Sequence, residues 1–293
     1  MLSRCAAILV LLTVAACVGA SAKPALRDGV VHVVAVENTW GDITAQIGGS
    51  HVEVTAILTD PATDPHTFET DPKTAAAVSN AGFVITNGLG YDAFADKLLS
   101  AGGGNRRSVL TVADAVGVRG DGVNPHLWYS PTYVQKAAAV IAGELTRLDP
   151  TDAPAFAAGL KAFLAGYQSY VDVVDQLKAH AGDKVAYTEP VPGYLVDAAG
   201  LVLGTPASFS RAVEDGTDPS PADFDAFQTA LRTGAVKAVL YNSQVTSPLT
   251  DQVKQLAEQS HTPLVEMTET LPSGTTFQAW QTAQAKALLA ALS

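Results

Sequence analysis

The chain has 293 residues, of which 47% are hydrophobic and only 16% charged, a length that commonly holds two compact domains. Disordered chains are polar and highly charged, so this composition excludes an intrinsically disordered protein. The formal net charge is −11, from 18 basic and 29 acidic residues, and the longest basic run is the pair Arg106–Arg107. Contacts with phosphates need clustered Lys and Arg, so the sequence also excludes a nucleic-acid-binding protein.

The first residues have the composition of an export signal. Arg4 gives a positive start, and residues 6–16 are apolar apart from Thr13. This stretch is too short to span a bilayer, which needs about 20 apolar residues.

Two cleavage points compete at the end of this signal. Ala20-Ser21-Ala22 suits ordinary signal peptidase, whereas Val14-Ala15-Ala16-Cys17 resembles the lipobox of bacterial lipoproteins. We favour the lipobox, because Cys17 comes directly after the apolar stretch. The prediction is a signal peptide over 1–16, a lipid on Cys17 and a tether over 17–29. Cys5 is then removed, and the mature chain has neither a disulfide nor a thiolate metal ligand.

From residue 30 onward, short apolar runs alternate with helical patterns. Continuous β-branched runs are typical of buried parallel strands, and alternation with helices predicts βα units. Strands are predicted over 30–36, 52–58, 83–86 and 108–112, and helices over 40–47, 73–81 and 131–147. Ser130 is the expected N-cap of the last helix, with Pro131 in its first position.

The most regular helical pattern runs from about 153 to 179. A helix of this length is roughly 40 Å long, which suits a stiff bridge between two βα blocks; the alternative is a packing helix within one domain. The βα pattern then resumes, with strands predicted over 184–188, 236–240 and 263–268 and helices from 221, from 248 and over 275–292. We therefore predict an α/β fold with lobes over 30–150 and 182–293, joined by a linking helix over 151–181.

Two of the six histidines stand in similar turns, Asp64-Pro65-His66 and Asn124-Pro125-His126. Proline fixes its own backbone and restricts the residue before it, so each imidazole is presented from a stiff loop. Ligands of open α/β sheets bind outside the carboxyl ends of the strands. Either histidine alone is ordinary on a surface, but the pair predicts a metal site.

A chain without thiolates needs oxygen ligands beside its histidines. Glu189 and Glu269 directly follow two predicted strands of the second lobe, so both carboxylates are expected at its crevice. The alternative is that each stabilises the N-terminus of a helix. Glu266 alternates within its strand and is expected to be structural or to face solvent.

Four segments occur in an order that resembles a known family: Asp64-Pro-His-Thr-Phe-Glu69, Asn87-Gly-Leu-Gly-Tyr-Asp92, Asn124-Pro-His-Leu-Trp-Tyr-Ser-Pro131 and Thr268-Glu-Thr270. They are similar to segments of the zinc- and manganese-binding substrate-binding lipoproteins of bacterial ABC importers. The likeness covers nearly all of the mature chain. It implies two βα lobes with parallel sheets, one long rigid helix between them, and a metal site in the interlobe cleft.

The resemblance also implies a ligand set. His66 and His126 match the two histidine ligands of the family's first lobe. Glu189 stands where zinc-type members have His and some manganese-type members have Glu. Glu269 stands where the family has its final ligand, Asp or Glu. The prolines at 190 and 192 are unusual there, and the His-rich loop of many zinc-type members is absent. Carboxylates favour manganese, whereas two imidazoles also suit zinc or iron(II), so the metal stays open.

The function implied is a monomeric receptor that captures manganese or zinc and delivers it to an ABC permease and its ATPase subunit. The metal is cargo, no catalytic cofactor or enzyme activity is expected, and the place is the periplasm or the outer face of the cytoplasmic membrane. One alternative is a receptor for a metal chelate such as haem or a siderophore. Another is a metal-dependent hydrolase, although no G-x-S-x-G or H-E-x-x-H motif is present.

The segment Gly88-Leu-Gly90-Tyr-Asp-Ala93 fits the G-x-G-x-x-A dinucleotide pattern, with Asp114 a little over twenty residues further on. It follows a third predicted strand rather than a first, and an exported lipoprotein rarely meets NAD. We expect its glycines to form a tight strand-to-helix turn near the metal.

Overall fold

The computed structural model describes residues 29–60, 68, 70–101 and 107–293. The predicted signal peptide and most of the tether, including Cys17, lie outside these residues. His66 also lies outside them.

The first lobe is built on a parallel sheet of four strands in the order β2-β1-β3-β4. Strand β1 is central and pairs with β2 and β3, and the residues of β3 are all buried, which explains their continuous apolar runs. The strands are β1 Val31–Glu37, β2 Val52–Leu58, β3 Phe83–Thr86 and β4 Ser108–Thr111. The helices are α1 Asn38–Gly48, α2 Pro72–Asn80, α3 Ala93–Ala101, α4 Val112–Val116 and α5 Pro131–Leu148, with short 3-10 turns η1 Gly49–His51 and η3 Leu127–Tyr129.

The second lobe repeats the arrangement with the strand order β6-β5-β7-β8, again all parallel. Its strands are β5 Lys184–Tyr187, β6 Val202–Leu203, β7 Val239–Asn242 and β8 Leu264–Met267. Its helices are α7 Gly193–Ala198, α8 Ala207–Glu214, α9 Pro221–Arg232, α10 Pro248–Gln259 and α11 Phe277–Leu292. The two-lobed α/β class predicted from the sequence is confirmed.

Most predicted elements fall within a residue or two of the observed ones. The strand predicted over 236–240 is wrong by three residues at its start: β7 begins at Val239, although Lys237 and Ala238 already form backbone hydrogen bonds with β5. The elements α3, α4, α7, α8 and β6 were not predicted. Ser130 caps α5 as expected, since its hydroxyl accepts a hydrogen bond from the Tyr133 amide.

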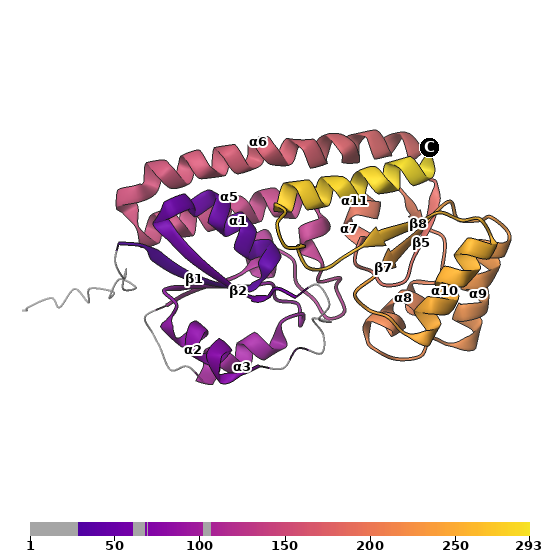
Figure 1. Ribbon diagram of the computed structural model, residues 1–293, viewed down its shortest axis with the longest axis horizontal. Helices are drawn as coiled ribbons and strands as arrows, with labels where there is room; N and C mark the ends of the chain where they lie inside the picture. Colours follow the sequence, from indigo (N-terminus) through magenta and orange to yellow (C-terminus); the bar gives the residue numbers. More distant parts are fainter. Residues whose placement is uncertain (1–28, 61–67, 69, 102–106) are drawn as a thin grey trace, which may run out of the picture.

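The long helix α6, Ala153–Leu177, lies between the 3-10 turns η4 Pro150–Asp152 and η5 Lys178–His180. Figure 1 shows it running along both lobes, with α11 beside it. Its contact with α1 is close, because a Cβ on Gly159 would stand 2.1 Å from the Ile47 carbonyl oxygen. Further along, Phe163 and Tyr167 both contact the ring of Phe277. The helix therefore packs on the first lobe at one end and on α11 towards the other.

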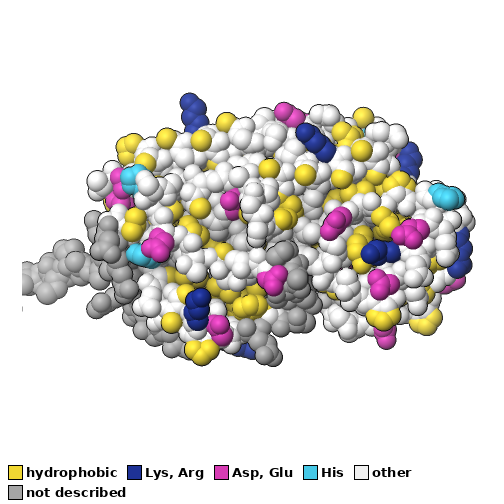
Figure 2. All heavy atoms as spheres, in the orientation of Figure 1, with side chains coloured by type: hydrophobic (Ala, Val, Ile, Leu, Met, Phe, Trp, Pro, Cys, Tyr) yellow, Lys and Arg dark blue, Asp and Glu magenta, His cyan; other side chains and the backbone are white. Residues whose placement is uncertain are grey.

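The main hydrophobic core includes buried residues of both lobes and of α6. No helix among the described residues is long and apolar enough to cross a membrane. On the face shown in Figure 2, Lys and Arg side chains lie apart from one another and form no basic patch.

Candidate metal centre between the lobes

His126 lies at the boundary between the two lobes, called the seam below, and its own turn holds it rigidly there. The side chain of Asn124 accepts hydrogen bonds from the His126 backbone N–H at 3.0 Å and from ring Nδ1 at 2.7 Å. Tyr91 and Trp128 pack edge-on against the imidazole, with ring centroids 5.6 and 5.4 Å away. The side chain is fully buried, so its position is fixed on all sides.

The orientation of the Asn124 amide determines which nitrogen of His126 carries the proton. Asn124 Nδ2 donates to the carbonyl of Pro190 at 2.7 Å, so Oδ1 faces the imidazole. An oxygen accepts only, and Nδ1 is therefore the donor. Nε2 is then the unprotonated nitrogen, and its lone pair points towards the centre of the seam. It lies 3.2 Å from Glu269 Oε2.

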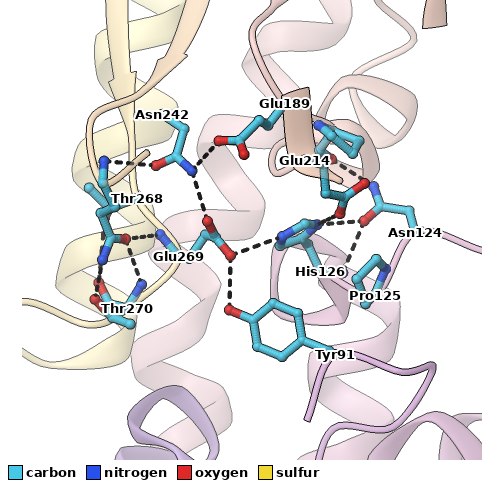
Figure 3. Close-up of polar contacts among 12 residues, drawn as sticks. Tyr91, Asn124, Pro125, His126, Glu189, Glu214, Asn242, Thr268, Glu269 and Thr270 are labelled. Atoms are coloured by element: carbon cyan, nitrogen blue, oxygen red, sulfur yellow. Dashed lines mark hydrogen bonds and ion pairs between the residues drawn. The ribbon is translucent and has the colours of Figure 1, made fainter. Parts of the chain in front are cut away.

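Two carboxylates enter from the second lobe, each just past the end of a strand. Glu189 follows β5, Glu269 follows β8, and each residue is only 2% exposed. Asn242, the last residue of β7, donates from Nδ2 to Glu189 Oε2 at 2.5 Å and to Glu269 Oε1 at 2.8 Å. One amide thus holds both carboxylates side by side (Figure 3).

Tyr91 adds a second contact across the seam. Its hydroxyl donates to Glu269 Oε2 at 2.9 Å. Burial, and then the negative charge of Glu269, raise the pKa of Tyr91 well above its usual range, so this hydroxyl stays protonated and remains a donor. Glu269 thereby accepts hydrogen bonds from Asn242 of its own lobe and from Tyr91 of the other, and His126 Nε2 lies beside it.

The backbone of Glu269 is fixed by Gln244, two residues past the end of β7. The side-chain oxygen of Gln244 accepts hydrogen bonds from the N–H groups of Glu269 and Thr270, and its Nε2 donates to the Thr270 hydroxyl at 2.7 Å. The loop after β8 therefore presents Glu269 in one orientation.

The turn that carries Tyr91 is the segment that fits a dinucleotide pattern. Gly88 and Gly90 have φ angles of +87° and +84°, which glycine adopts without strain. Asp92 accepts hydrogen bonds from the N–H groups of Asn87 at 2.6 Å and Gly88 at 2.9 Å. These glycines form a tight strand-to-helix turn beside the seam, as predicted.

A second buried acid lies next to this turn. Glu37 at the end of β1 is 3% exposed. Burial, and then the negative charge of Asp92, raise the pKa of Glu37 well above its usual range. Burial also raises the pKa of Asp92.

Three of the four predicted site residues lie at the boundary between the lobes: His126 is next to Glu269, and Glu189 is joined to Glu269 through Asn242. The fourth, His66, lies outside the described residues. Those residues contain no group of three or more His, Cys, Asp or Glu side chains close enough to hold a metal ion. Glu266 is exposed, which agrees with the solvent-facing alternative.

Sequence reasoning missed Asn242, Tyr91 and a third carboxylate, Glu214, whose Oε1 lies 3.8 Å from His126 Nδ1. Asn242 ends a buried parallel strand, so the rule that pointed to Glu189 and Glu269 also applied to it. Nothing in the pattern around Glu214 distinguishes it from a surface acid near a helix end.

Two parallel α/β lobes, a helix along both, and a buried polar site at the strand ends define the class of two-lobed binding proteins. A family model described as zinc-uptake complex component A, periplasmic (ZnuA) matches residues 33–291. The chain belongs to this family, and the resemblance stated from its motifs is confirmed.

Individual relatives agree with this assignment. The chain is 27% identical over 224 residues to the manganese-binding lipoprotein MntA of Halalkalibacterium halodurans, which covers 71% of this chain and 74% of that protein. It is 24% identical over 260 residues to the high-affinity zinc uptake system protein ZnuA of Bacillus subtilis, covering 82% and 80%.

Solved structures share the fold. A crystal structure of ZnuA superposes with a TM-score of 0.73 at 21% identity, covering 90% of this chain and all of that one. The Mn-bound periplasmic metal binding protein from Candidatus Liberibacter asiaticus gives a TM-score of 0.74 at 20% identity, with the same coverage.

Proposed function

We propose that this protein is an extracytoplasmic receptor that captures a divalent transition metal, manganese or zinc, and delivers it to an ABC permease and its ATPase subunit. Membership in the ZnuA family supports this function, as do the names of relatives that bind manganese or take up zinc. The observation that carries the proposal is the meeting of His126 Nε2 and Glu269 Oε2, 3.2 Å apart, from opposite lobes.

This spacing suits two ligands of one ion. Zinc bonds to nitrogen and oxygen are about 2.0–2.2 Å long, and in a tetrahedral site two such ligand atoms stand roughly 3.3 Å apart. Glu189, tied to Glu269 through Asn242, brings a second carboxylate to the same place. We assign the ligands as His66 and His126 from the first lobe and Glu189 and Glu269 from the second.

The donor set fits both candidate metals. Two carboxylates neutralise a divalent charge, which lowers the cost of holding the ion in a buried site. Carboxylate oxygens suit manganese and imidazoles suit zinc. Four protein ligands fill a tetrahedral zinc site and leave no open position for a reacting water, which favours carriage of the ion over a reaction on it.

The rest of the proposal concerns how the receptor is arranged and where it works. Residues 30–150 and 182–293 act as lobes, and 151–181 acts as the linking segment. Residues 1–16 direct export, and Cys17 carries a lipid that anchors the protein through the tether 17–29. The monomer works at the outer face of the cytoplasmic membrane or in the periplasm.

The test is metal binding by the chain from residue 18 onward, which includes every described element. Titration of the metal-stripped protein with Zn²⁺ and with Mn²⁺ gives one tight site per chain. His126→Ala and Glu189→Ala each remove that site, while His180→Ala, which changes a histidine on η5, keeps it. Equal binding by the wild type and Glu189→Ala contradicts the proposed ligand set, and no tight binding by the wild type contradicts the function.

A further inference from the structure

Glu214 stands behind His126, on the side away from the centre of the seam. It ends α8 of the second lobe, its side chain is 12% exposed, and its Oε1 lies 3.8 Å from His126 Nδ1. Nδ1 already donates to Asn124 of its own lobe. The imidazole therefore meets a carboxylate of the second lobe at each nitrogen, Glu269 at Nε2 and Glu214 at Nδ1 (Figure 3).

The loop that carries His126 is held by the second lobe at further points. Asn124 donates to the carbonyl of Pro190, the residue after Glu189, and the Tyr194 hydroxyl donates to the Asn124 carbonyl at 2.8 Å. Arg211, one turn before Glu214 on α8, lies against Gly122, where a Cβ would stand 2.7 Å from its Nη1. A cavity of about 200 Å³ borders these contacts. The contact between Glu214 and His126 thus belongs to a set that exists only while the lobes are together.

We propose that Glu214 is a positioning residue that retains the metal by acting through His126. A metal-bound imidazole donates electron density to the ion and gains positive character at its Nδ1–H. Asn124 fixes the ring by accepting the Nδ1–H hydrogen bond, and a carboxylate 3.8 Å away stabilises the positive character electrostatically, which strengthens the donation to the ion as outer-shell carboxylates do. The inference rests on the proposed function, because it takes His126 as a metal ligand.

The location of Glu214 on the opposite lobe decides which step it affects. While the lobes are apart, His126 has only Asn124 at Nδ1, so Glu214 contributes little to the first encounter with the ion. Once the lobes close, Glu214 reaches the ring and stabilises the loaded state. Loss of its charge therefore speeds metal release and leaves metal capture almost unchanged.

Asp215 provides a matched control. It is the next residue, it is exposed, and it lines the same cavity. Asp215→Asn removes the same formal charge from the same rim as Glu214→Gln. A general loss of negative potential affects both variants equally, whereas loss of the contact with His126 affects only Glu214→Gln.

The experiment measures zinc association and zinc release into excess EDTA by stopped flow. Trp128 is the fluorescent probe, since its ring lies 5.4 Å from His126. We expect Glu214→Gln to release zinc about 10-fold faster, within the 10- to 100-fold range of outer-shell substitutions. Its association rate, its stoichiometry and the Tm of the metal-free protein stay at wild-type values, and Asp215→Asn behaves as wild type. Glu214→Asp, which keeps the charge, restores part of the slow release.

Equal release rates for Glu214→Gln and Asp215→Asn overturn the inference. A lower Tm of metal-free Glu214→Gln also overturns it, because the residue is then structural. A wild-type protein that binds no zinc overturns the proposed function itself, which separates the two failures.

Discussion

The two sides of the boundary between the lobes are built differently. Along α6 the contacts are close, with Gly159 against the Ile47 backbone of the first lobe, and largely apolar on α11, with the rings of Phe163 and Tyr167 on Phe277. At the metal centre the lobes meet through hydrogen bonds between polar side chains (Figure 3). Separating apolar surfaces exposes them to water, whereas polar groups can exchange one another for water at little net cost. The lobes therefore separate most easily at the metal centre, while the α6 side stays packed.

The largest expected effect is at the polar side. Glu269→Gln keeps the shape of the side chain but removes a charge from the proposed ligand set. We expect metal affinity to fall more than about 100-fold, since even outer-shell substitutions reach that range. Isothermal titration with Mn²⁺ and Zn²⁺ measures it. Glu266→Gln, which changes an exposed carboxylate of β8, is the control, and equal affinities for both variants contradict the assignment of Glu269.

Tyr91→Phe makes a smaller change at the same place. The variant loses the hydroxyl that donates to Glu269 Oε2 and keeps the ring that packs on His126. The expected loss of affinity is about 10-fold, at the low end for an outer-shell partner, with one site retained. A variant that binds metal as tightly as the wild type shows that this hydrogen bond does not orient the carboxylate.

On the packed side the expected effect is on stability. The Cβ of Gly159→Ala meets the Ile47 carbonyl oxygen, and such overpacking lowers the free energy of unfolding by about 1–3 kcal/mol. Gly143 of α5 is the matched control, because a Cβ there meets nothing within 4 Å. Gly143→Ala should raise stability by about 0.5–1 kcal/mol through helix propensity. Urea unfolding measures both, and a stabilised Gly159→Ala contradicts the close contact of α6 and α1.

The smallest expected effect is the pH dependence caused by Glu37. Its pKa is higher in the folded protein than in the unfolded chain, so its stabilising effect is complete below the unfolded pKa. That effect is lost as the pH rises through the folded pKa. Glu37→Gln does not titrate, so its Tm should rise by a few degrees relative to wild type between pH 4.5 and pH 8.

A variant of an exposed acid tests whether this shift is specific to Glu37. Glu258 is exposed on α10, and Glu258→Gln should follow the wild type at every pH. A Tm difference between Glu37→Gln and wild type that does not change with pH contradicts the raised pKa.

The fold was predictable because its signals are local. Continuous β-branched runs such as β3 and the N-cap Ser130 specify their elements with little help from the rest of the chain. The long recurrence of apolar residues at intervals of three and four likewise specified α6. The short elements β6 and α7 depend on neighbours in space for their stability, and no pattern in a single sequence reveals those neighbours.

The site was predictable only where a residue type and a strand end coincided. His126 was found from its turn, and Glu189 and Glu269 from their places after strands. Asn242 stands at an equivalent strand end, but a neutral amide is a less common ligand of transition metals than a carboxylate, so its residue type did not mark it. Glu214 reaches His126 only because the two lobes meet, which is a property of the tertiary structure.

The most direct test of the central claim is a crystal structure of the manganese- or zinc-loaded protein, with diffraction data collected on both sides of the metal absorption edge. The account predicts a single strong anomalous peak in the seam, about 2.0–2.2 Å from His126 Nε2 and from carboxylate oxygens of Glu189 and Glu269. A peak elsewhere on the molecule, or a loaded protein in which Glu189 and Glu269 turn away from His126, would contradict it.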